Sequence, residues 1–260
     1  MSLQKVNFVC CPFHYGLKSE GTSLGCYMLS KVFKPVNFEL LEKWFKECWF
    51  ARYQVTGALV FDEIFKFENL DGKKIVFLNG DHFSTYFIVK SLLKTIDNFV
   101  LIWVDAHPDL NTPYESPSGN IHGMTLRHLF GDGYSQLTSE RFLNPDQVYL
   151  VQVTEFDPGE NAFIAQRDKK VYVAEDLTHL RFPVPVYLSI DFDVFSDFEA
   201  VNVSAKTSVN IENFKGYLST FIQNNDVIWV DFNEYDAYKD RDLEEFKKAV
   251  GLISYVSGLL

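Results

Sequence analysis

The chain has 260 residues, of which 47% are hydrophobic and 23% are charged, and it is therefore long and apolar enough to bury a substantial core. Its formal net charge of −11 argues against a nucleic-acid surface or an anionic membrane as partner, and it is compatible with a cationic substrate. No apolar run is long enough to span a bilayer, and the N-terminus does not resemble a signal peptide.

The cysteines exclude a Cys-rich structural zinc site. Cys10 and Cys11 are adjacent and poorly placed to bond each other, and Cys26 and Cys48 complete no C-x-x-C pair. No histidine lies at finger-like spacing from them. We interpret all four as reduced, mostly buried thiols, which is typical of a cytoplasmic protein.

Strand and helix patterns alternate along most of the chain. Apolar runs predict strands at residues 5–10, 55–61, 75–78, 99–104, 147–153, 170–174, 185–190 and 227–232. Helical spacing of apolar residues predicts helices at 38–50, 83–95, 125–130, 211–222 and 242–260. Asn37 is the expected N-cap of the first of these helices, and the proline and glycines between residues 12 and 25 predict a loop. A second irregular loop, rich in Pro, Ser and Thr, is expected at 111–119.

Several of the predicted strands are continuous apolar runs, which is typical of a parallel sheet covered by helices on both faces. No Gly/Ser-rich linker, composition break or internal repeat divides the chain. We therefore expect residues 1–260 to form a single α/β domain with a mainly parallel central sheet. In such a sheet the functional loops gather beyond the carboxyl ends of the strands.

Potential metal ligands follow three of the predicted strands. They are His82, then Asp105, His107 and Asp109, and finally Asp191 and Asp193. The spacing of the middle three turns their side chains to the same side of an extended strand end. Taken singly, an aspartate at a strand end is more often a turn or helix cap, and a lone histidine is more often a hydrogen-bonded polar residue. Three such clusters at equivalent strand ends favour a metal centre.

The composition of these clusters indicates the kind of ion. Carboxylates with imidazole, and no thiolate, suit Mn²⁺, Fe²⁺, Co²⁺ or Zn²⁺. Four carboxylates packed closely would repel one another unless cations neutralised them. The simplest arrangement is two divalent ions with bridging carboxylates, which can lower the pKa of a bound water to give hydroxide at neutral pH.

Four motifs follow one another between about Ile75 and Asp193. They are Asn79-Gly80-Asp81-His82-Phe83-Ser84, Asp105-Ala106-His107-Pro108-Asp109 with Thr112-Pro113, Ser118-Gly119-Asn120-Ile121-His122-Gly123, and Ser189-Ile190-Asp191-Phe192-Asp193. Together with a weaker match at Val230-Asp231-Phe232-Asn233, they resemble the ureohydrolase family, which includes arginase, agmatinase, guanidinobutyrase and formimidoylglutamase.

The resemblance implies a three-layer α/β/α, arginase-like fold and a dimanganese site. One Mn²⁺ would be held by His82, Asp105, Asp109 and Asp191, and the other by His107, Asp105, Asp191 and Asp193, so that Asp105 and Asp191 bridge. A bridging hydroxide would attack an amidino-type carbon and cleave a C–N bond.

The resemblance also implies roles for residues around the metals. Asp109 would pass a proton to the departing nitrogen, and His122 would act as a proton shuttle or contact the substrate. For His122 the alternative is a loop histidine bonded to backbone. Ser118, Asn120 and Asp231 are the expected substrate contacts, with Asp231 in the place of a longer glutamate that anchors the guanidinium.

Departures from the family pattern affect the pocket and spare the metal ligands. After Asp193 the Gly-Thr-Pro signature is missing, and the segment around Gln152 and Thr154 lacks the usual Gly-x-Arg pattern. The expected substrate is therefore a guanidino, amidino or formimidoyl compound, and the charge argument above favours a small cationic one.

Three functional hypotheses result from this reading. The leading one is a binuclear manganese-dependent hydrolase of the ureohydrolase type, although other divalent ions are possible. The second is a metal-dependent deacetylase-like amidohydrolase of the wider arginase-like superfamily. The third is a catalytically silent metal-binding scaffold. A homo-oligomer is possible by analogy with relatives.

Overall fold

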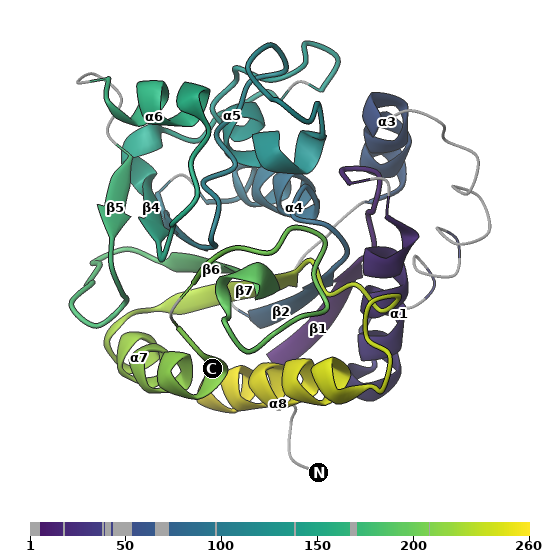
Figure 1. The fold of residues 1–260 in the computed structure, drawn as a ribbon. Coiled ribbons are helices and arrows are strands. Elements are labelled where there is room, and N and C mark those ends of the chain that lie inside the picture. The colour runs from purple at the N-terminus through teal and green to yellow at the C-terminus, as the bar shows by residue number, and fades with distance from the viewer. Residues whose placement is uncertain are drawn as a thin grey trace.

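The computed structural model describes residues 6–17, 19–37, 39, 43, 54–65, 73–96, 98–137, 139–166, 171–207 and 209–260. Its centre is a seven-stranded sheet in which every neighbouring pair of strands is parallel, in the order β1-β2-β7-β6-β3-β4-β5 (Figure 1). The strands are β1 (Val6–Cys11), β2 (Lys74–Asn79), β3 (Val100–Val104), β4 (Val148–Val151), β5 (Tyr172–Ala174), β6 (Val186–Asp191) and β7 (Val227–Asn233). The expected mainly parallel sheet is confirmed.

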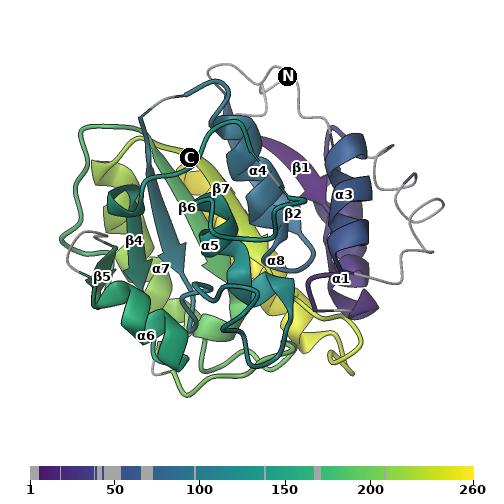
Figure 2. The ribbon, with the colours of Figure 1, turned by 90° about the horizontal axis from the view of Figure 1, so that it is seen from above.

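Helices cover both faces of this sheet (Figures 1 and 2). The α-helices are α1 (Glu20–Phe33), α3 (Gln54–Ile64), α4 (Ser84–Leu92), α5 (Thr125–Leu129), α6 (Pro158–Ile164), α7 (Ile211–Asn224) and α8 (Glu244–Leu259). Three short 3₁₀ helices are η1 (Ile121–Met124), η2 (Pro145–Gln147) and η3 (Phe192–Val194). The helices α1, α7 and α8 lie on one face, and α3, α4 and α5 lie on the other.

Two hydrophobic cores, one on each face, explain why the strands are continuous apolar runs. Successive residues of a strand point to opposite faces. In β3, Val100, Ile102 and Val104 therefore belong to the core beneath α7 and α8, whereas Leu101 and Trp103 belong to the core beneath α4 and α5. Both sets are buried, so no polar position interrupts the strand.

The expected loop between residues 12 and 25 is wrong in its second half, where α1 begins at Glu20. Glycine normally disfavours a helix, but here it permits close packing. A Cβ on Gly21 would lie 1.7 Å from Asp236 Oδ1, and a Cβ on Gly25 would lie 2.1 Å from the carbonyl oxygen of Tyr235. The glycines therefore bring α1 against the segment that follows β7.

The strand expected at 55–61 is also wrong, because these residues lie within α3. The buried positions Gln54, Gly57, Ala58 and Phe61 recur at helical spacing. A short apolar run does not by itself distinguish a strand from a buried helix, and Gly57 obscured the pattern. A Cβ on Gly57 would lie 2.6 Å from the Tyr15 ring, so this glycine also allows close packing.

The other expected strands are present with slightly shifted ends, as are the helices near 83–95, 125–130, 211–222 and 242–260. Most of the helix expected at 38–50 lies outside the described residues. Asn37 bonds to β1, because its side chain accepts the N–H of Cys10 at 2.8 Å and donates to the Cys10 carbonyl at 2.7 Å. The helix α6 was not expected. It begins at Pro158 with a capping box between Asp157 and Glu160.

The topology places the functional edge of the sheet. In the order β2-β7-β6-β3, four neighbouring parallel strands have their carboxyl ends side by side. The loops after these strands therefore meet above the middle of the sheet. Within the described ranges, no helix combines the length and the apolar character needed to cross a membrane.

The packing of α1 against the β7 exit gives a stability prediction. Gly25→Ala should lower the free energy of unfolding by about 1–3 kcal/mol, because the new methyl would collide with a backbone carbonyl that cannot swing away. Urea unfolding measures this. The matched control is Gly251→Ala in α8, where a Cβ meets nothing within 4 Å and the change should be neutral or stabilising by up to about 1 kcal/mol. Equal effects of the two substitutions would contradict the packing argument.

Candidate metal centre

The turn after β2 delivers His82 to the edge of the sheet. Gly80 is required there, since a Cβ would lie 1.9 Å from the Phe13 carbonyl oxygen. The Asp81 carboxylate accepts the N–H of Gly16 at 2.6 Å and the N–H of Phe83 at 3.1 Å. Asp81 thus connects the segment after β1 to this turn and fixes the backbone position from which the His82 side chain extends.

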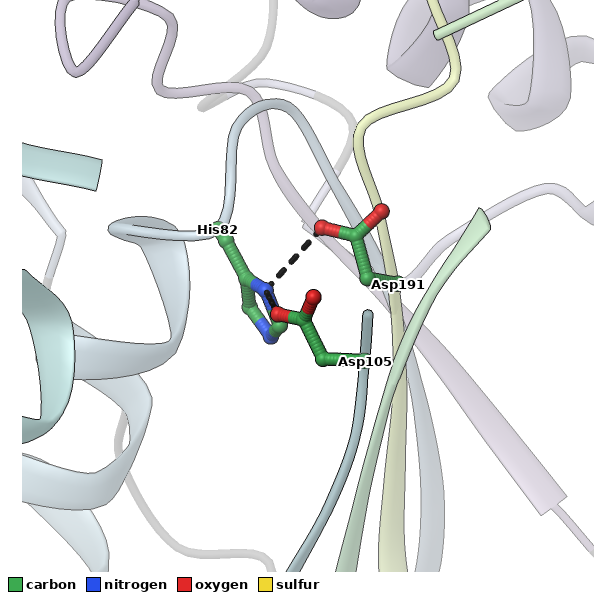
Figure 3. Close-up of side chains that lie close together, drawn as sticks. All are labelled: His82, Asp105 and Asp191. Atoms are coloured by element: carbon green, nitrogen blue, oxygen red, sulfur yellow. Dashed lines mark ion pairs between the residues drawn. The ribbon is translucent and has the colours of Figure 1, made fainter. Parts of the chain in front are cut away.

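His82 faces carboxylates from two other strands. Its Nδ1 lies 2.9 Å from Asp105 Oδ2 and 3.0 Å from Asp191 Oδ2, as Figure 3 shows, and 3.6 Å from Asp109 Oδ2. The imidazole is fully buried and stacks on Trp103 with ring centroids 3.8 Å apart and planes 6° from parallel. The ring is therefore held in one orientation with Nδ1 toward the acids.

A second histidine–carboxylate group lies beside the first. His107 Nδ1 is 2.8 Å from Asp193 Oδ2 and 3.6 Å from Asp105 Oδ1. Asp193 Oδ1 accepts the N–H of Ala106 at 3.2 Å, which ties the ends of β3 and β6 together. Within each group, His82–Asp105–Asp191 and Asp105–His107–Asp193, the potential ligand atoms lie within 4.8 Å of one another. Asp105 belongs to both groups.

Two acidic residues of the site have left-handed backbone conformations, Asp109 with φ 48° and Glu234 with φ 70°. Such conformations are costly for residues other than glycine and are found where surrounding structure enforces them. Here the Asp109 carbonyl accepts the N–H of Leu126 at 3.1 Å, and the N–H of Glu234 donates to the Gly80 carbonyl at 2.9 Å. These bonds hold both carboxylates at the edge of the cluster.

Burial and mutual repulsion shift the protonation of the acids. Burial, followed by the charge of Asp105, raises the pKa of Asp109 well above its usual range and that of Asp193 to about 7. Burial and the neighbouring Asp193 raise the pKa of Asp191 as well. Burial alone would lower the pKa of His107, but Asp105 and Asp193 raise it to about 12. Without cations, the cluster therefore retains protons at neutral pH.

The donor set fits divalent ions. Two imidazoles and three carboxylates form the two groups, and the nearby Asp109 Oδ2 is buried with no hydrogen-bond partner among the described residues. Oxygen and nitrogen ligands of this kind suit Mn²⁺ and its neighbours in the first transition row. The structure therefore brings five of the six residues expected as metal ligands into two overlapping groups, and it places Asp109 beside the first group, with Oδ2 3.6 Å from His82 Nδ1.

The motif around Ser118 lies along a cleft that opens above this cluster. Ser118, Asn120 and His122 line a cleft of ≈ 530 Å³ that also borders His107 and Asp109. Asn120 is positioned by Gln54, whose Nε2 donates to Asn120 Oδ1 at 3.0 Å. These three residues therefore face the space where a substrate would lie.

Asp231, expected among the substrate contacts, lies elsewhere. Its carboxylate is fully buried, does not line the cleft, and accepts hydrogen bonds from Thr85 and Tyr187 on one oxygen and from Ser189 on the other. The structure does not bring Asp231 to the cleft because it lies inside β7, where the strand directs its side chain into the protein.

The acidic residue beside the cluster is Glu234, which sequence reasoning missed. It comes directly after β7 and lines the same small pocket as His122 and the carboxylates expected as metal ligands. Its Oε1 accepts the N–H of His82 at 2.9 Å and lies 3.4 Å from His122 Nδ1. Its place beyond the carboxyl end of a strand was the available signal.

A second missed feature is the start of α6. Asp157 Oδ2 accepts from Asn111 Nδ2 at 2.8 Å, and Glu160 Oε1 accepts the N–H of Leu110 at 2.9 Å. The capping box at α6 thus connects to the loop that carries Asp109, and both acids border the cleft. The sequence Asp157-Pro158-Gly159-Glu160 carries the helix-start signal that would have revealed it.

The protonation of the cluster predicts how metal binding depends on pH. Mn²⁺ binding at neutral pH should release protons, because the ions displace protons shared by the acids and imidazoles. The measured affinity should fall as the pH is lowered from about 8 to about 6. An indicator dye measures the protons and equilibrium dialysis measures the affinity. Binding that releases no protons and keeps the same affinity at both pH values would contradict this account.

Comparison with known proteins agrees with the fold and the motifs. The model of the Arginase family matches residues 59–255. The arginase of Staphylococcus aureus strain COL is 35% identical over 129 residues, which are 49% of this chain and 43% of that protein. The arginase of Brevibacillus brevis is 28% identical over 207 residues, which are 72% of this chain and 70% of that protein. The chain thus matches less than half of the length of the S. aureus relative.

Solved structures extend the likeness of fold over nearly the whole chain. Entamoeba histolytica arginase in complex with L-ornithine superposes with a TM-score of 0.75 at 22% identity and 99% coverage of both chains. Proclavaminate amidino hydrolase of Streptomyces clavuligerus superposes with a TM-score of 0.68 at 15% identity, covering 98% of this chain and 91% of the other. With the family model matching about three quarters of its length, from residue 59 to residue 255, the chain belongs to the arginase family.

Proposed function

We propose that the chain is a binuclear manganese-dependent hydrolase that cleaves a C–N bond of a guanidino, amidino or formimidoyl compound. The observation that carries this proposal is the pair of adjacent histidine–carboxylate groups that share Asp105 and open into a cleft. Membership of the arginase family supports the same class of reaction.

The ligand sets follow from the two groups. One ion would be held by His82, Asp105, Asp109 and Asp191, and the other by His107, Asp105, Asp191 and Asp193. Each proposed set contains one complete group of converging atoms. When bound, two such ions act as Lewis acids and supply an activated water as nucleophile at neutral pH.

Asp109 is the proposed proton carrier. It borders both the ligand cluster and the cleft, and burial raises its pKa. Its Oδ2 has no hydrogen-bond partner in the described part of the chain and lies 3.6 Å from His82 Nδ1, so this atom is placed to bind the ion and the other carboxylate oxygen remains to hold a proton. A carboxyl group with a raised pKa, close to the reacting atoms, can pass that proton to a departing nitrogen.

Glu234 is the proposed anchor for the cationic end of the substrate. Its Oε2 is buried and lacks a hydrogen-bond partner among the described residues, whereas its Oε1 is held by the N–H of His82. A guanidinium or amidinium group offers several N–H donors and a positive charge, which a fixed carboxylate binds strongly. His122, 3.4 Å from Glu234, lies where it can contact the same end or shuttle a proton.

The outer part of the cleft carries both signs of charge. Glu155, Asp157 and Glu160 border it, and so does Lys206, from the loop between η3 and α7. We therefore propose a substrate whose distal end also carries charged groups. The E. histolytica arginase of the same fold was solved with L-ornithine, whose amino-acid end carries both an ammonium and a carboxylate.

This proposal predicts turnover by the manganese-loaded protein. Urea or the corresponding small amide should be released from at least one member of a panel comprising arginine, agmatine, 4-guanidinobutyrate and formimidoylglutamate, with an acetyl-lysine substrate included to detect deacetylation. His122→Asn should lower kcat by about 10²- to 10⁴-fold, the usual contribution of a positioned acid or base. The control Lys94→Gln, on an exposed residue away from the cleft, should leave kcat unchanged.

Two outcomes would redirect the function. Turnover of the acetyl-lysine substrate alone would favour the deacetylase-like alternative. Two bound ions without turnover of any substrate would favour the silent scaffold.

The anchoring role of Glu234 has a separate test. Glu234→Gln removes the charge but keeps the size and the acceptor of the His82 N–H, so it should lower kcat/KM by about 10- to 100-fold, corresponding to about 1.5–3 kcal/mol for a hydrogen bond to a charged group. Bound manganese should stay the same. Glu199→Gln, on the surface, serves as the control. If kcat/KM is unchanged while metal content is normal, another residue binds the cationic end.

A further inference from the structure

His82 has a hydrogen-bond partner on the side that faces away from the acids. Its Nε2 lies 2.9 Å from Ser189 Oγ, within the buried interior of β6. Nδ1 is the ring nitrogen that faces the acids, and a cation binds a ring nitrogen through a lone pair that carries no hydrogen. In the metal-bound protein the single hydrogen of the neutral imidazole is therefore on Nε2. His82 therefore donates to Ser189.

The Ser189 hydroxyl continues the chain of hydrogen bonds. A hydroxyl has one hydrogen to donate. Ser189 Oγ lies 2.7 Å from Asp231 Oδ1, and the carboxylate can only accept that hydrogen. The direction of both bonds is thereby fixed, from His82 to Ser189 and from Ser189 to Asp231.

Asp231 is held by neutral donors. Besides Ser189, its oxygens accept from Asn233 Nδ2 at 2.7 Å, Thr85 Oγ1 at 2.7 Å, the Tyr187 hydroxyl and the N–H of Ile190 at 3.3 Å. Its side chain is completely buried, and no Lys or Arg is among the partners that the structure records for it. A buried carboxylate that accepts this many hydrogen bonds from neutral donors polarises the hydrogen-bond chain that ends on it.

We propose that Asp231 and Ser189 are positioning residues of the metal centre. The hydrogen-bond chain Asp231–Ser189–His82 fixes which ring nitrogen of His82 faces the ion, and it raises the affinity of the protein for that one ion. This inference rests on the proposed metal binding at His82, but not on any hydrolytic activity. It gives Asp231 a role behind the metal centre in place of the substrate contact expected from sequence. Partners of this kind behind metal-bound histidines typically change metal affinity by about 10- to 100-fold.

A purely structural role is the competing explanation, because Asp231 also joins β6, β7 and α4. Tyr187→Phe separates the two. The Tyr187 hydroxyl donates to Oδ2 of Asp231, whereas Ser189 donates to Oδ1, so the substitution removes a donor to Asp231 without breaking the chain to His82. It is the matched control, because it lowers stability but keeps the hydrogen-bond chain to His82 intact.

The test measures manganese binding to the whole polypeptide. The electron paramagnetic resonance signal of free Mn²⁺ is recorded during the titration. Ser189→Ala should lower the affinity for the ion at His82 by about 10- to 100-fold. The affinity for the ion at His107 should stay unchanged, since His107 is not part of the hydrogen-bond chain. Ser189→Thr, which keeps the hydroxyl, should restore binding. Tyr187→Phe should lower the free energy of unfolding in urea but bind both ions normally.

The outcomes separate this inference from the proposed function. Normal manganese affinity of the Ser189→Ala variant would overturn the role of the hydrogen-bond chain. An equal loss of manganese affinity in the Tyr187→Phe variant would overturn it as well. Absence of manganese binding by the unaltered protein would instead overturn the metal centre itself. Asp231→Asn provides a second measurement and should weaken the same ion, while Ser189→Ala keeps the inference testable if Asp231→Asn fails to fold.

Discussion

The repulsion among four buried carboxylates is the constraint on which the rest of this structure depends. Asp105, Asp109, Asp191 and Asp193 gather where β3 and β6 end, and the positively chargeable groups that the structure places beside them are His82 and His107. Two imidazolium groups carry too little positive charge to balance four carboxylates, which have also lost their contact with water. Without cations the cluster keeps protons, and with cations it releases them. The stability of this edge of the sheet is therefore linked to metal binding by mass action.

The surrounding protein holds this cluster in place mainly with neutral groups. Asp81 accepts backbone N–H groups from the segment after β1, and Asp231 accepts hydroxyl, amide and backbone donors. Neutral donors stabilise a buried carboxylate without placing a positive charge that would repel divalent ions. The left-handed conformations of Asp109 and Glu234 are likewise held by neutral groups, because backbone hydrogen bonds with Leu126 and Gly80 offset their cost. Acids at the centre and neutral dipoles around it thus form one electrostatic arrangement.

The sequence predicted what is determined locally. Asp105, His107 and Asp109 share one short segment after a strand, and in a parallel sheet all strand exits lie at one edge, so their meeting with His82 and Asp191 follows from the topology. The errors involve contacts between distant segments. Gly21 and Gly25 indicated a loop because the chain near Tyr235 and Asp236, against which they pack, lies more than 200 residues away. Asp231 and Glu234 are three residues apart and both buried, but the end of β7 between them leaves Asp231 directed into the protein and places Glu234 in the small pocket beside the ligand cluster.

That last distinction changes the argument about the substrate. With Asp231 as the anchor, a carboxylate one methylene too short would have had to bind the guanidinium, which weakened the case for guanidino hydrolysis. With Glu234 as the proposed anchor, a full-length glutamate lies beside His122 and the expected metal ligands, and the proposal no longer meets that objection. In the outer cleft, Lys206 from the loop between η3 and α7 and the acids at the start of α6 line the same space. In the proposed function, the strand ends therefore supply the groups for the reaction, whereas loops that the sheet does not constrain supply the contacts to the distal end of the substrate.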